Sequence, residues 1–559
     1  MADATDSVSR QRDHAEWWAF FAWSAGSYLF LTALLLGTPR GRVIYIFDDA
    51  AIHLDVARDL AYHFTWGIAP GHFESASSSP LWTVLLALAI RPAAFAATWL
   101  PLFFTLSSSL ALLAILASCQ KVLRPQWRRP VDIIAVVVLT NVVLFLPAMT
   151  LLGMEHVLHA ALVVGAVALV ARQLDGDATW GPASLPIALF VLAEATRFET
   201  IFVAFGLVVA VVIARARGRS FPSVASRSLA LSCAAATAIP FAVFAVVNRA
   251  MGGGWLPNSL LSRSNSLGTS SSFSLNYFLR QSTKDHLLLA CSCVLLVVIV
   301  WGWRELKGYT LVAIATLIAI VLQISVASIG QFERYQEYLI ALTVYVALMA
   351  AGDVYARRQE STRQWTLILA CAVVLSVLVS SQRTTLLRRV PRASADVYQQ
   401  KFLAGEFLEK YYRNDTVASG ELGWIAWLHH GPFVDLLGLG DYDILQELRA
   451  TSGKAPATYW AHIATQDHVH VVVEYPLTLG GGVPASWILV GTWVLHRPLT
   501  TAYQRDLEFW VTSPRAVAPL QRHLRAFAPN LPRAETLRLA PYASLIAARE
   551  IRQQMAAHE

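Results

Sequence analysis

Ile46-Phe47-Asp48-Asp49-Ala50 is the stretch that decides how this chain is read, because two adjacent carboxylates follow an apolar run that ends near Gly37. Ionisable groups beside a membrane span are costly to desolvate and are usually retained for chemistry, ion pairing or orientation. From Asp49 to Phe64, apolar residues recur at helical spacing with polar residues between them, which predicts an amphipathic helix on the membrane surface. An acidic pair held there favours an enzyme that acts on a lipid-linked substrate.

The rest of the chain has the composition of a polytopic α-helical membrane protein. Of its 559 residues, 56% are hydrophobic and 14% are charged, and apolar runs of about 17–25 residues are long enough to cross a bilayer as helices. We predict eleven spans, at 17–37, 95–118, 131–150, 155–172, 183–197, 200–214, 228–249, 286–303, 309–328, 335–352 and 365–382. Arg91-Pro92 cuts a further apolar run at 81–91 short, so this run is either a brief crossing or an interfacial helix.

Lysine and arginine predict the orientation. With the N-terminus inside, basic residues fall in the inner loops, whereas the short outer turns at 151–155 and 330–333 carry none. The inner residues are Lys121, Arg124, Arg128, Arg129, Arg172, Arg215, Arg217, Arg219, Arg227, Arg304, Lys307, Arg357, Arg358 and Arg363. We therefore expect a multi-pass protein of the bacterial plasma (inner) membrane, with a cytoplasmic N-terminus and an extracytoplasmic C-terminal domain.

Three regions follow along the chain. Residues 1–382 are predicted to form a transmembrane catalytic module, with a large first outer loop at 38–94 and a mobile outer loop at 250–285 that could act as a lid. Residues 383–398 form a basic, polar connector, and 399–559 form the extracytoplasmic domain.

The last region has the pattern of a small α/β domain. Short apolar strands at 417–419, 433–437 and 469–475 alternate with a helix at 441–450 and another that ends at 462–466. Gly480-Gly481-Gly482 lacks the Lys-Ser/Thr of a phosphate loop and predicts a plain turn. There is no nucleic-acid motif, and the net charge of +7 reflects mostly the inner-loop arginines.

Asp48 and Asp49 are the first candidates for chemistry. Sugar transfer from a phospholipid donor needs a carboxylate that takes the acceptor proton or holds a metal such as Mg or Mn, and cations that stabilise the departing phosphate. Adjacent carboxylates cannot both face one point along a helix, so at most one is expected to be the base. The alternative is that Asp48 only caps the following helix.

Glu74 is the third catalytic candidate, and His72 a substrate-binding one. They precede Ser79-Pro80, which reads as the start of the next helix, with Ser79 as its N-cap. Helix initiation explains Ser79 and Pro80 but leaves Glu74 unexplained, so Glu74 either lines the site or has a structural role.

Further substrate-binding candidates lie at other outer turns. They are Glu155, Arg197, Glu199, Asn258, Arg263, Arg334 and Tyr335. Arg263 is a candidate for a bidentate phosphate clamp, and Glu333 and Glu337 are close enough in sequence to neutralise Arg334. The alternative for Arg197 is a structural ion pair with Glu155 or Glu199.

In these motifs the chain resembles the bacterial polytopic glycosyltransferases of the GT-C class, most of all the branch with the arabinofuranosyltransferases and related mannosyltransferase-like proteins. The similar elements, in order, are Phe47-Asp48-Asp49-Ala50, Glu74 with Ser79-Pro80-Leu81-Trp82, Gly153-Met154-Glu155, Arg197-Phe198-Glu199, Leu256-Pro257-Asn258-Ser259, Arg334-Tyr335, Gly420-Glu421-Leu422-Gly423 and Val434-Asp435-Leu436-Leu437-Gly438-Leu439.

The resemblance implies a polyprenyl-monophosphate sugar donor, a glycan or glycolipid acceptor, inversion at the anomeric carbon and one aspartate of the pair as base. Some members use a divalent cation. The chain departs from the family at Asp55, where a basic residue is expected, at Phe198, where proline is common, and at Arg263, where lysine is usual.

The sequence leaves two alternative functions open, a transporter or flippase and a non-catalytic binding protein. A transporter or flippase of lipid-linked substrates predicts paired charges at mid-membrane depth and a two-fold pattern of broken spans, neither of which is visible here. A non-catalytic envelope protein would bind glycan through residues 399–559.

Overall fold

The computed structural model describes residues 2–68, 72–118, 134, 136–177, 181–222, 224–259, 261–262, 286–327, 329–356, 382–480 and 482–541. The chain divides into two compact units. The first comprises 1–36, 101–244 and 272–388, and the second comprises 37–100, 245–271 and 389–559. The first outer loop therefore belongs to the same unit as the C-terminal domain.

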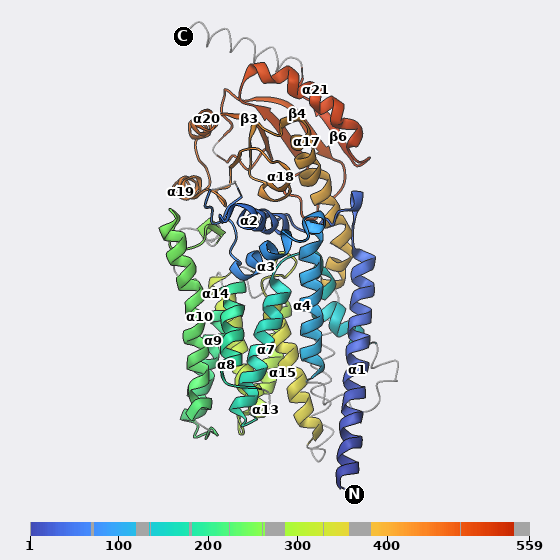
Figure 1. Ribbon diagram of the computed structural model, residues 1–559, viewed down its shortest axis with the longest axis vertical. Helices are drawn as coiled ribbons and strands as arrows, with labels where there is room; N and C mark the ends of the chain where they lie inside the picture. The colour runs from blue at the N-terminus through green and yellow to red at the C-terminus, as the bar shows by residue number, and fades with distance from the viewer. Residues whose placement is uncertain are drawn as a thin grey trace. The chain divides into compact units, whose positions relative to one another are not determined.

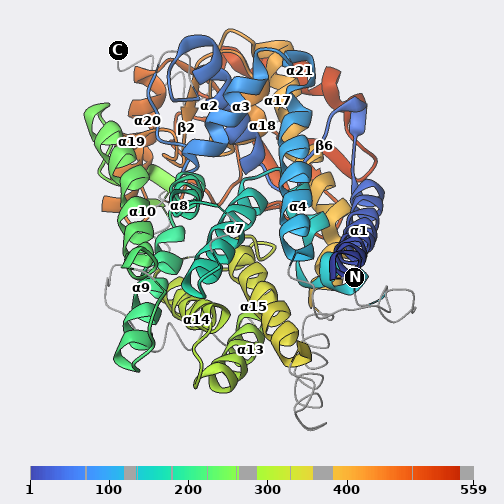
Figure 2. The same ribbon diagram turned by 60° about the horizontal axis from the view of Figure 1, so that its bottom comes forward.

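The first unit consists of helices. They are α1 (Ala2–Leu35), most of α4 (Leu100–Ala117), π-helical η3 (Leu139–Val143), α6 (Leu146–Leu151), α7 (His156–Leu174), α8 (Ser184–Thr196), α9 (Thr200–Ala216), most of α10 (Val224–Ala250), α13 (His286–Gly302), α14 (Gly308–Val326) and α15 (Glu337–Ala356). Figure 2 shows α7, α9, α13, α14 and α15 side by side, with α14 contacting both α9 and α15. The α9–α14 contact is close because Gly206 faces the Ala315 backbone, as small residues allow in membrane bundles.

Most predicted spans correspond to helices. Within the described residues, five helical segments are long and apolar enough to cross a membrane: Trp17–Leu35, Ala94–Ala117, His156–Leu174, Ser228–Ala250 and Gly308–Val326. The predicted span 131–150 is interrupted, because Phe145 takes a left-handed conformation (φ 53°) between η3 and α6. The predicted span 365–382 lies outside the described residues.

The run at 81–91 forms α3 (Pro80–Ile90), which has 11 residues. At a rise of 1.5 Å per residue, such a helix is about half as long as the hydrocarbon core is thick. It belongs to the second unit, where it packs against α2 (Asp49–His63). The structure thus disfavours a separate crossing.

The second unit is built on a six-stranded mixed sheet of order β2-β1-β3-β5-β4-β6. The strands are β1 (Thr416–Ser419), β2 (Phe433–Asp435), β3 (Val469–Glu474), β4 (Ile488–Leu495), β5 (Asp506–Val511) and β6 (Glu535–Leu539). β1 pairs in parallel with β2 and β3, and the remaining pairs are antiparallel.

Helices cover both faces of this sheet (Figure 1). α17 (Leu403–Tyr412) and α21 (Val517–Phe527) bury Phe407 and Leu524 against Val471 and Val473 on one face. α19 (Tyr442–Ala450) and α20 (Ala457–Gln466) pack with Val472 on the other. This alternation along β3 is the period-two pattern of a strand buried on both sides. The predicted α/β domain is confirmed.

The predicted connector at 383–398 is not an irregular linker. Residues 382–396 are helical, and the π-helical turn η4 (Val397–Phe402) carries this helix into α17. Polar side chains of this helix contact the α/β domain. Within the second unit, Asp396 pairs with Arg497 and accepts hydrogen bonds from the backbone N–H groups of Thr500 and Thr501.

Candidate functional site

Asp48 does not cap α2 with its side chain. It precedes the helix, but its carboxylate instead accepts hydrogen bonds from the backbone N–H groups of Gly423 (3.0 Å) and Trp424 (2.8 Å). These groups belong to the first turn of α18 (Leu422–Leu428), where N–H groups have no partner inside the helix. The capping interpretation was wrong about which helix is capped. Asp48 accepts hydrogen bonds from the first turn of a helix that lies more than 370 positions later in the sequence.

Lys401 completes the surroundings of Asp48. This residue comes from the π-helical turn η4, and its ammonium group pairs with Glu421 and lies 3.9 Å from Asp48 Oδ2. Burial raises the pKa of Asp48 to about 6, although Lys401 lowers it. Burial lowers the pKa of Lys401, but the Glu421 and Asp48 carboxylates together hold it above its usual value. The lysine therefore stays charged beside the buried carboxyl.

Gly423 is required by this close approach. A methyl group added at this glycine would lie well inside van der Waals distance of the Asp48 side chain and of its backbone oxygen. Only glycine lets the N-terminal turn of α18 approach Asp48 closely enough to donate both hydrogen bonds. In the Gly420-Glu421-Leu422-Gly423 motif, Gly423 thus acts through its backbone and Glu421 through its side chain, which pairs with Lys401.

Asp49 differs from its neighbour. It is the first residue of α2 and is half-buried, whereas Asp48 is only 5% exposed. It is near enough that its charge raises the pKa values of both Asp48 and Lys401. The two carboxylates are therefore held differently: one is enclosed by α18, and the other stands at the start of α2.

α2 itself is not the surface helix that its sequence predicts. It packs between α3 and α18, and its polar residues His53, Asp55 and Asp59 are buried. His53 contacts Ser77 (3.0 Å), and Asp55 pairs with Arg58, whose guanidinium lies 4.6 Å from the Trp427 ring. Apolar Phe64 is 79% exposed. The amphipathic pattern did not predict the burial of these polar residues, because protein surrounds the helix and supplies partners for its polar groups.

Glu74 and His72 lie in the loop between α2 and α3. Glu74 Oε2 accepts a hydrogen bond from the Ile68 N–H (2.8 Å), and the Glu74 N–H donates to the Trp66 carbonyl (2.7 Å). Glu74 therefore closes this loop, which supports the structural alternative for it. His72 is exposed.

Asn258 joins the second outer loop to the α/β domain of the same unit. Its side-chain amide is buried and donates to the Leu439 carbonyl (3.2 Å), in the turn after β2. Asn248 donates to the carbonyls of Gly254 and Leu256 and so shapes the start of this loop. Arg263 and most of the predicted lid lie outside the described residues.

In the first unit, five predicted site residues gather in one cluster, which we call the Arg197 cluster: Glu155, Arg197, Glu199, Arg334 and Tyr335. Arg197 donates two hydrogen bonds to Glu199 (2.6 and 3.1 Å) and one to Glu155 (2.7 Å). Arg197 thus forms both of the ion pairs that the sequence offered as alternatives, one with Glu155 and one with Glu199.

Arg334 and Tyr335 form the other half of the Arg197 cluster. The Tyr335 ring lies between two guanidinium groups, 5.4 Å from that of Arg197 and 4.9 Å from that of Arg334. Arg334 donates to the Tyr335 hydroxyl (2.8 Å) and to the Met154 sulfur (3.0 Å). Stacking of guanidinium on an aromatic face is favourable.

Glu333 and Glu337, which are close enough in sequence to neutralise Arg334, both form ion pairs with Arg383. Arg383 is fully buried, donates to the Val143 carbonyl and lies 5.0 Å from the Phe145 ring. Sequence reasoning placed it at the edge of a polar connector and missed it. The interruption of the 131–150 span explains its position, because the helix stops before Phe145 and backbone carbonyls such as that of Val143 need a donor from elsewhere.

The surroundings of Asp48 do not fit a divalent cation. Backbone N–H donors and an ammonium group surround the Asp48 carboxylate, whereas Mg²⁺ requires oxygen ligands. Across the part of the chain that the structure describes, no group of three or more His, Cys, Asp or Glu side chains could hold a metal ion.

The comparisons with known proteins concern the C-terminal domain and the fold. Residues 393–512 match a family model described as a domain of unknown function (DUF8728). No curated protein sequence matches the chain significantly.

Two solved structures are similar at low sequence identity. ArnT from Cupriavidus metallidurans bound to undecaprenyl phosphate has a TM-score of 0.50 and 13% identity, covering 88% of this chain and 97% of that chain. An oligosaccharyltransferase from Archaeoglobus fulgidus, in complex with Zn and sulfate, has a TM-score of 0.45 and 14% identity, covering 93% of this chain and 75% of that chain. The predicted architecture is confirmed: the chain is a polytopic α-helical membrane protein with a GT-C-like fold and a C-terminal α/β domain.

Proposed function

We propose that this protein is a membrane glycosyltransferase that moves a sugar from a polyprenyl-monophosphate donor to a hydroxyl of an envelope glycan or glycolipid. The GT-C-like fold supports this class of reaction, and the similar ArnT structure holds undecaprenyl phosphate. The observation that carries the proposal is the enclosure of Asp48 by α18, because it leaves the half-buried Asp49 at the start of α2 as the carboxylate for chemistry.

We assign Asp49 as the general base and Asp48 as its positioning residue. Asp48 is buried and already accepts two backbone hydrogen bonds, so an acceptor hydroxyl would have to displace α18 to reach it. Asp49 follows Asp48 directly in the chain, so the hydrogen bonds that hold Asp48 also fix the position of Asp49. A base acts only if it is within hydrogen-bond reach of the proton that it takes.

The proposed reaction is a single inverting displacement. The acceptor oxygen forms a bond to the anomeric carbon while the bond from that carbon to the phosphate oxygen breaks. The electron pair of the broken bond leaves with polyprenyl phosphate, and the acceptor proton passes to Asp49. General-base assistance of this kind contributes about 10²–10⁴-fold in rate.

For the Arg197 cluster we propose a division of roles. Arg197, Glu155 and Glu199 hold their outer turns together, since the Arg197 donors are used by the two carboxylates. Arg334 and Tyr335, which now donate to Met154 and Gln331, are proposed to exchange these neutral partners for the oxygens of the donor phosphate. Arg334→Gln is then expected to raise the KM for the donor more than it lowers kcat.

The test is to reconstitute the purified protein in nanodiscs and to incubate it with a panel of polyprenyl-phosphate sugars and candidate acceptors. We expect one donor to be consumed, with polyprenyl phosphate released in equal amount. Translocation of intact donor in vesicles, with no release of polyprenyl phosphate from any donor, would instead identify a flippase. Retention of glycan with neither result would identify a binding protein.

A further inference from the structure

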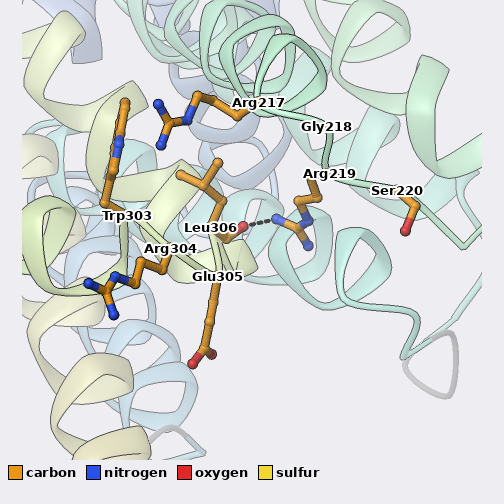
Figure 3. Close-up of a pocket in the computed structure, with 8 residues that line it drawn as sticks. All are labelled: Arg217, Gly218, Arg219, Ser220, Trp303, Arg304, Glu305 and Leu306. Atoms are coloured by element: carbon orange, nitrogen blue, oxygen red, sulfur yellow. Dashed lines mark hydrogen bonds between the residues drawn. The ribbon is translucent and has the colours of Figure 1, made fainter.

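A cavity of about 410 Å³ lies in the first unit, between the turn after α9 and the turn after α13. Its lining residues are Arg217, Gly218, Arg219, Ser220, Trp303, Arg304, Glu305 and Leu306 (Figure 3). We call it the arginine pocket. None of these residues belongs to the Arg197 cluster or to the surroundings of Asp48.

Only some of the charges in the arginine pocket are compensated. Arg219 donates to Asp175 (2.7 Å) and to the carbonyls of Leu174 and Leu306. Lys307, next to the pocket, lies 3.4 Å from Glu305 and also pairs with Asp353. The nearby carboxylates therefore already have cationic partners.

Arg217 and Arg304 are the other two arginines of the pocket. Figure 3 shows the Arg219 side chain turned to Leu306, whereas those of Arg217 and Arg304 extend beside Trp303. The Arg217 guanidinium lies 5.1 Å from the Trp303 ring, and both arginines are exposed. Within the described residues, neither forms an ion pair with a carboxylate. The pocket thus presents two positive charges and an indole ring.

An apolar hollow adjoins the arginine pocket along the chain. It measures about 360 Å³ and is lined by Val208, Val211, Val212, Ala230 and Leu231, with Arg215 and Ser228. The hollow lies between α9 and α10, and α9 leads directly from it to Arg217. The hollow lies along the last turns of α9 and the arginine pocket at the turn that follows, so together they offer the apolar and cationic parts that an amphiphile with an anionic head needs.

We propose that this composite site binds an anionic phospholipid, with the phosphate between Arg217 and Arg304 and an acyl chain along the hollow. Guanidinium groups bind phosphate through charge-assisted hydrogen bonds. Trp303 is the residue type enriched at the membrane–water interface. The arginine distribution predicts that this end of the bundle is cytoplasmic, and basic pockets between helices on that side bind anionic head groups.

The test measures phospholipid retention by native mass spectrometry on the full chain. Protein purified from nanodiscs containing equal amounts of phosphatidylglycerol and phosphatidylcholine is expected to keep phosphatidylglycerol selectively. Because each basic residue near an anionic membrane surface contributes roughly fivefold in binding, Arg217→Gln/Arg304→Gln is expected to weaken this retention by about 30-fold. Arg249→Gln/Arg388→Gln removes two exposed arginines outside the pocket, so it controls for the loss of two charges and should retain the lipid.

Two further arms make the outcome decisive. Arg217→Lys/Arg304→Lys keeps the charge and should retain part of the selectivity, and it replaces the glutamine variant if that variant fails to fold. Inorganic phosphate in solution should displace the lipid only weakly, because it has no acyl chain. Equal retention of both lipids by the wild type, equal retention by the wild type and the glutamine variant, or full displacement by inorganic phosphate would each overturn the proposal.

Discussion

At the residue scale, Asp48 and Asp49 have the same chemistry and opposite surroundings. Asp48 is enclosed by two backbone N–H groups and Lys401, and Asp49 is half-buried at the head of α2. The sequence identified the pair but not the difference, because the groups that distinguish them come from residues 401, 423 and 424. No local pattern around residue 48 refers to these distant partners.

Asp49→Asn is predicted to abolish transfer. The amide cannot accept the proton, so the rate should fall about 10²–10⁴-fold, while thermal unfolding of the purified protein stays unchanged. Release of polyprenyl phosphate measures the rate. Undiminished turnover by Asp49→Asn would remove Asp49 from the proposed mechanism.

Asp48 is predicted to make stability depend on pH. Its pKa is raised from 3.8 to about 6, so between these values the folded protein binds a proton that the unfolded chain has released. Stability from this group is therefore present below about pH 4 and falls as pH rises to 6, by about 1.4 kcal/mol per pH unit at most. Wild type should lose stability relative to Asp48→Asn between pH 4 and 6, and the difference between their unfolding midpoints should then stay constant up to pH 8. A difference that is constant from pH 4 to 8 would contradict this.

Gly423→Ala is predicted to destabilise the protein, because its methyl group would overlap Asp48. Overpacking of this kind costs about 1–3 kcal/mol. Gly26→Ala is the matched control: Gly26 lies inside α1 with no neighbouring atom in reach, and alanine favours helix there. Thermal unfolding compares the two variants, and equal midpoints would show that α18 can move away from Asp48.

At the element scale, local patterns predicted some parts of the α/β domain well. β1 to β3 and α19 appear where the apolar runs and the predicted helix at 441–450 place them. The structure adds that Asp441 caps α19 by accepting hydrogen bonds from the Asp443 and Ile444 N–H groups. β5 has an alternating burial pattern that the sequence reading did not use. The π-helical turn η4 could not be predicted, yet it places Lys401 beside Glu421 and Asp48.

Lys401→Met is predicted to cost about 3–5 kcal/mol, since it leaves the Glu421 and Asp48 carboxylates buried without their cation. The double variant Lys401→Met/Glu421→Gln should recover part of this loss. A double-mutant cycle by denaturant unfolding gives the coupling energy. A coupling energy near zero would mean that the Lys401–Glu421 ion pair does not stabilise the fold.

At the scale of the whole molecule, composition and charge predicted the membrane bundle and the attached α/β domain correctly. They assigned residues 38–94 to the membrane module, whereas the structure groups 37–100 with the C-terminal domain. Hydropathy shows where a chain can enter a bilayer but not which distant segments share a core. For the same reason the sequence did not reveal the role of Arg383, whose partners come from two distant segments, around residue 143 and at 333–337.

Arg383→Gln is predicted to destabilise the first unit by about 3–5 kcal/mol, because it leaves Glu333 and Glu337 facing each other with no cation between them. Arg388→Gln removes an exposed charge from the same helix and is the control. Thermal unfolding in detergent should separate the two variants by several degrees. Similar midpoints would show that the Arg383 pairs contribute little.

The hydrogen bonds from Gly423 and Trp424 to Asp48 also determine when the surroundings of Asp48 can form during synthesis of the chain. Residue 48 leaves the ribosome 376 positions before its partner Trp424, and a ribosome adds about 5–20 residues per second. Throughout that interval the acidic pair has no α18 to fix it. Under the proposed function, a nascent chain therefore cannot transfer sugar until α18 has been synthesised and has folded against Asp48.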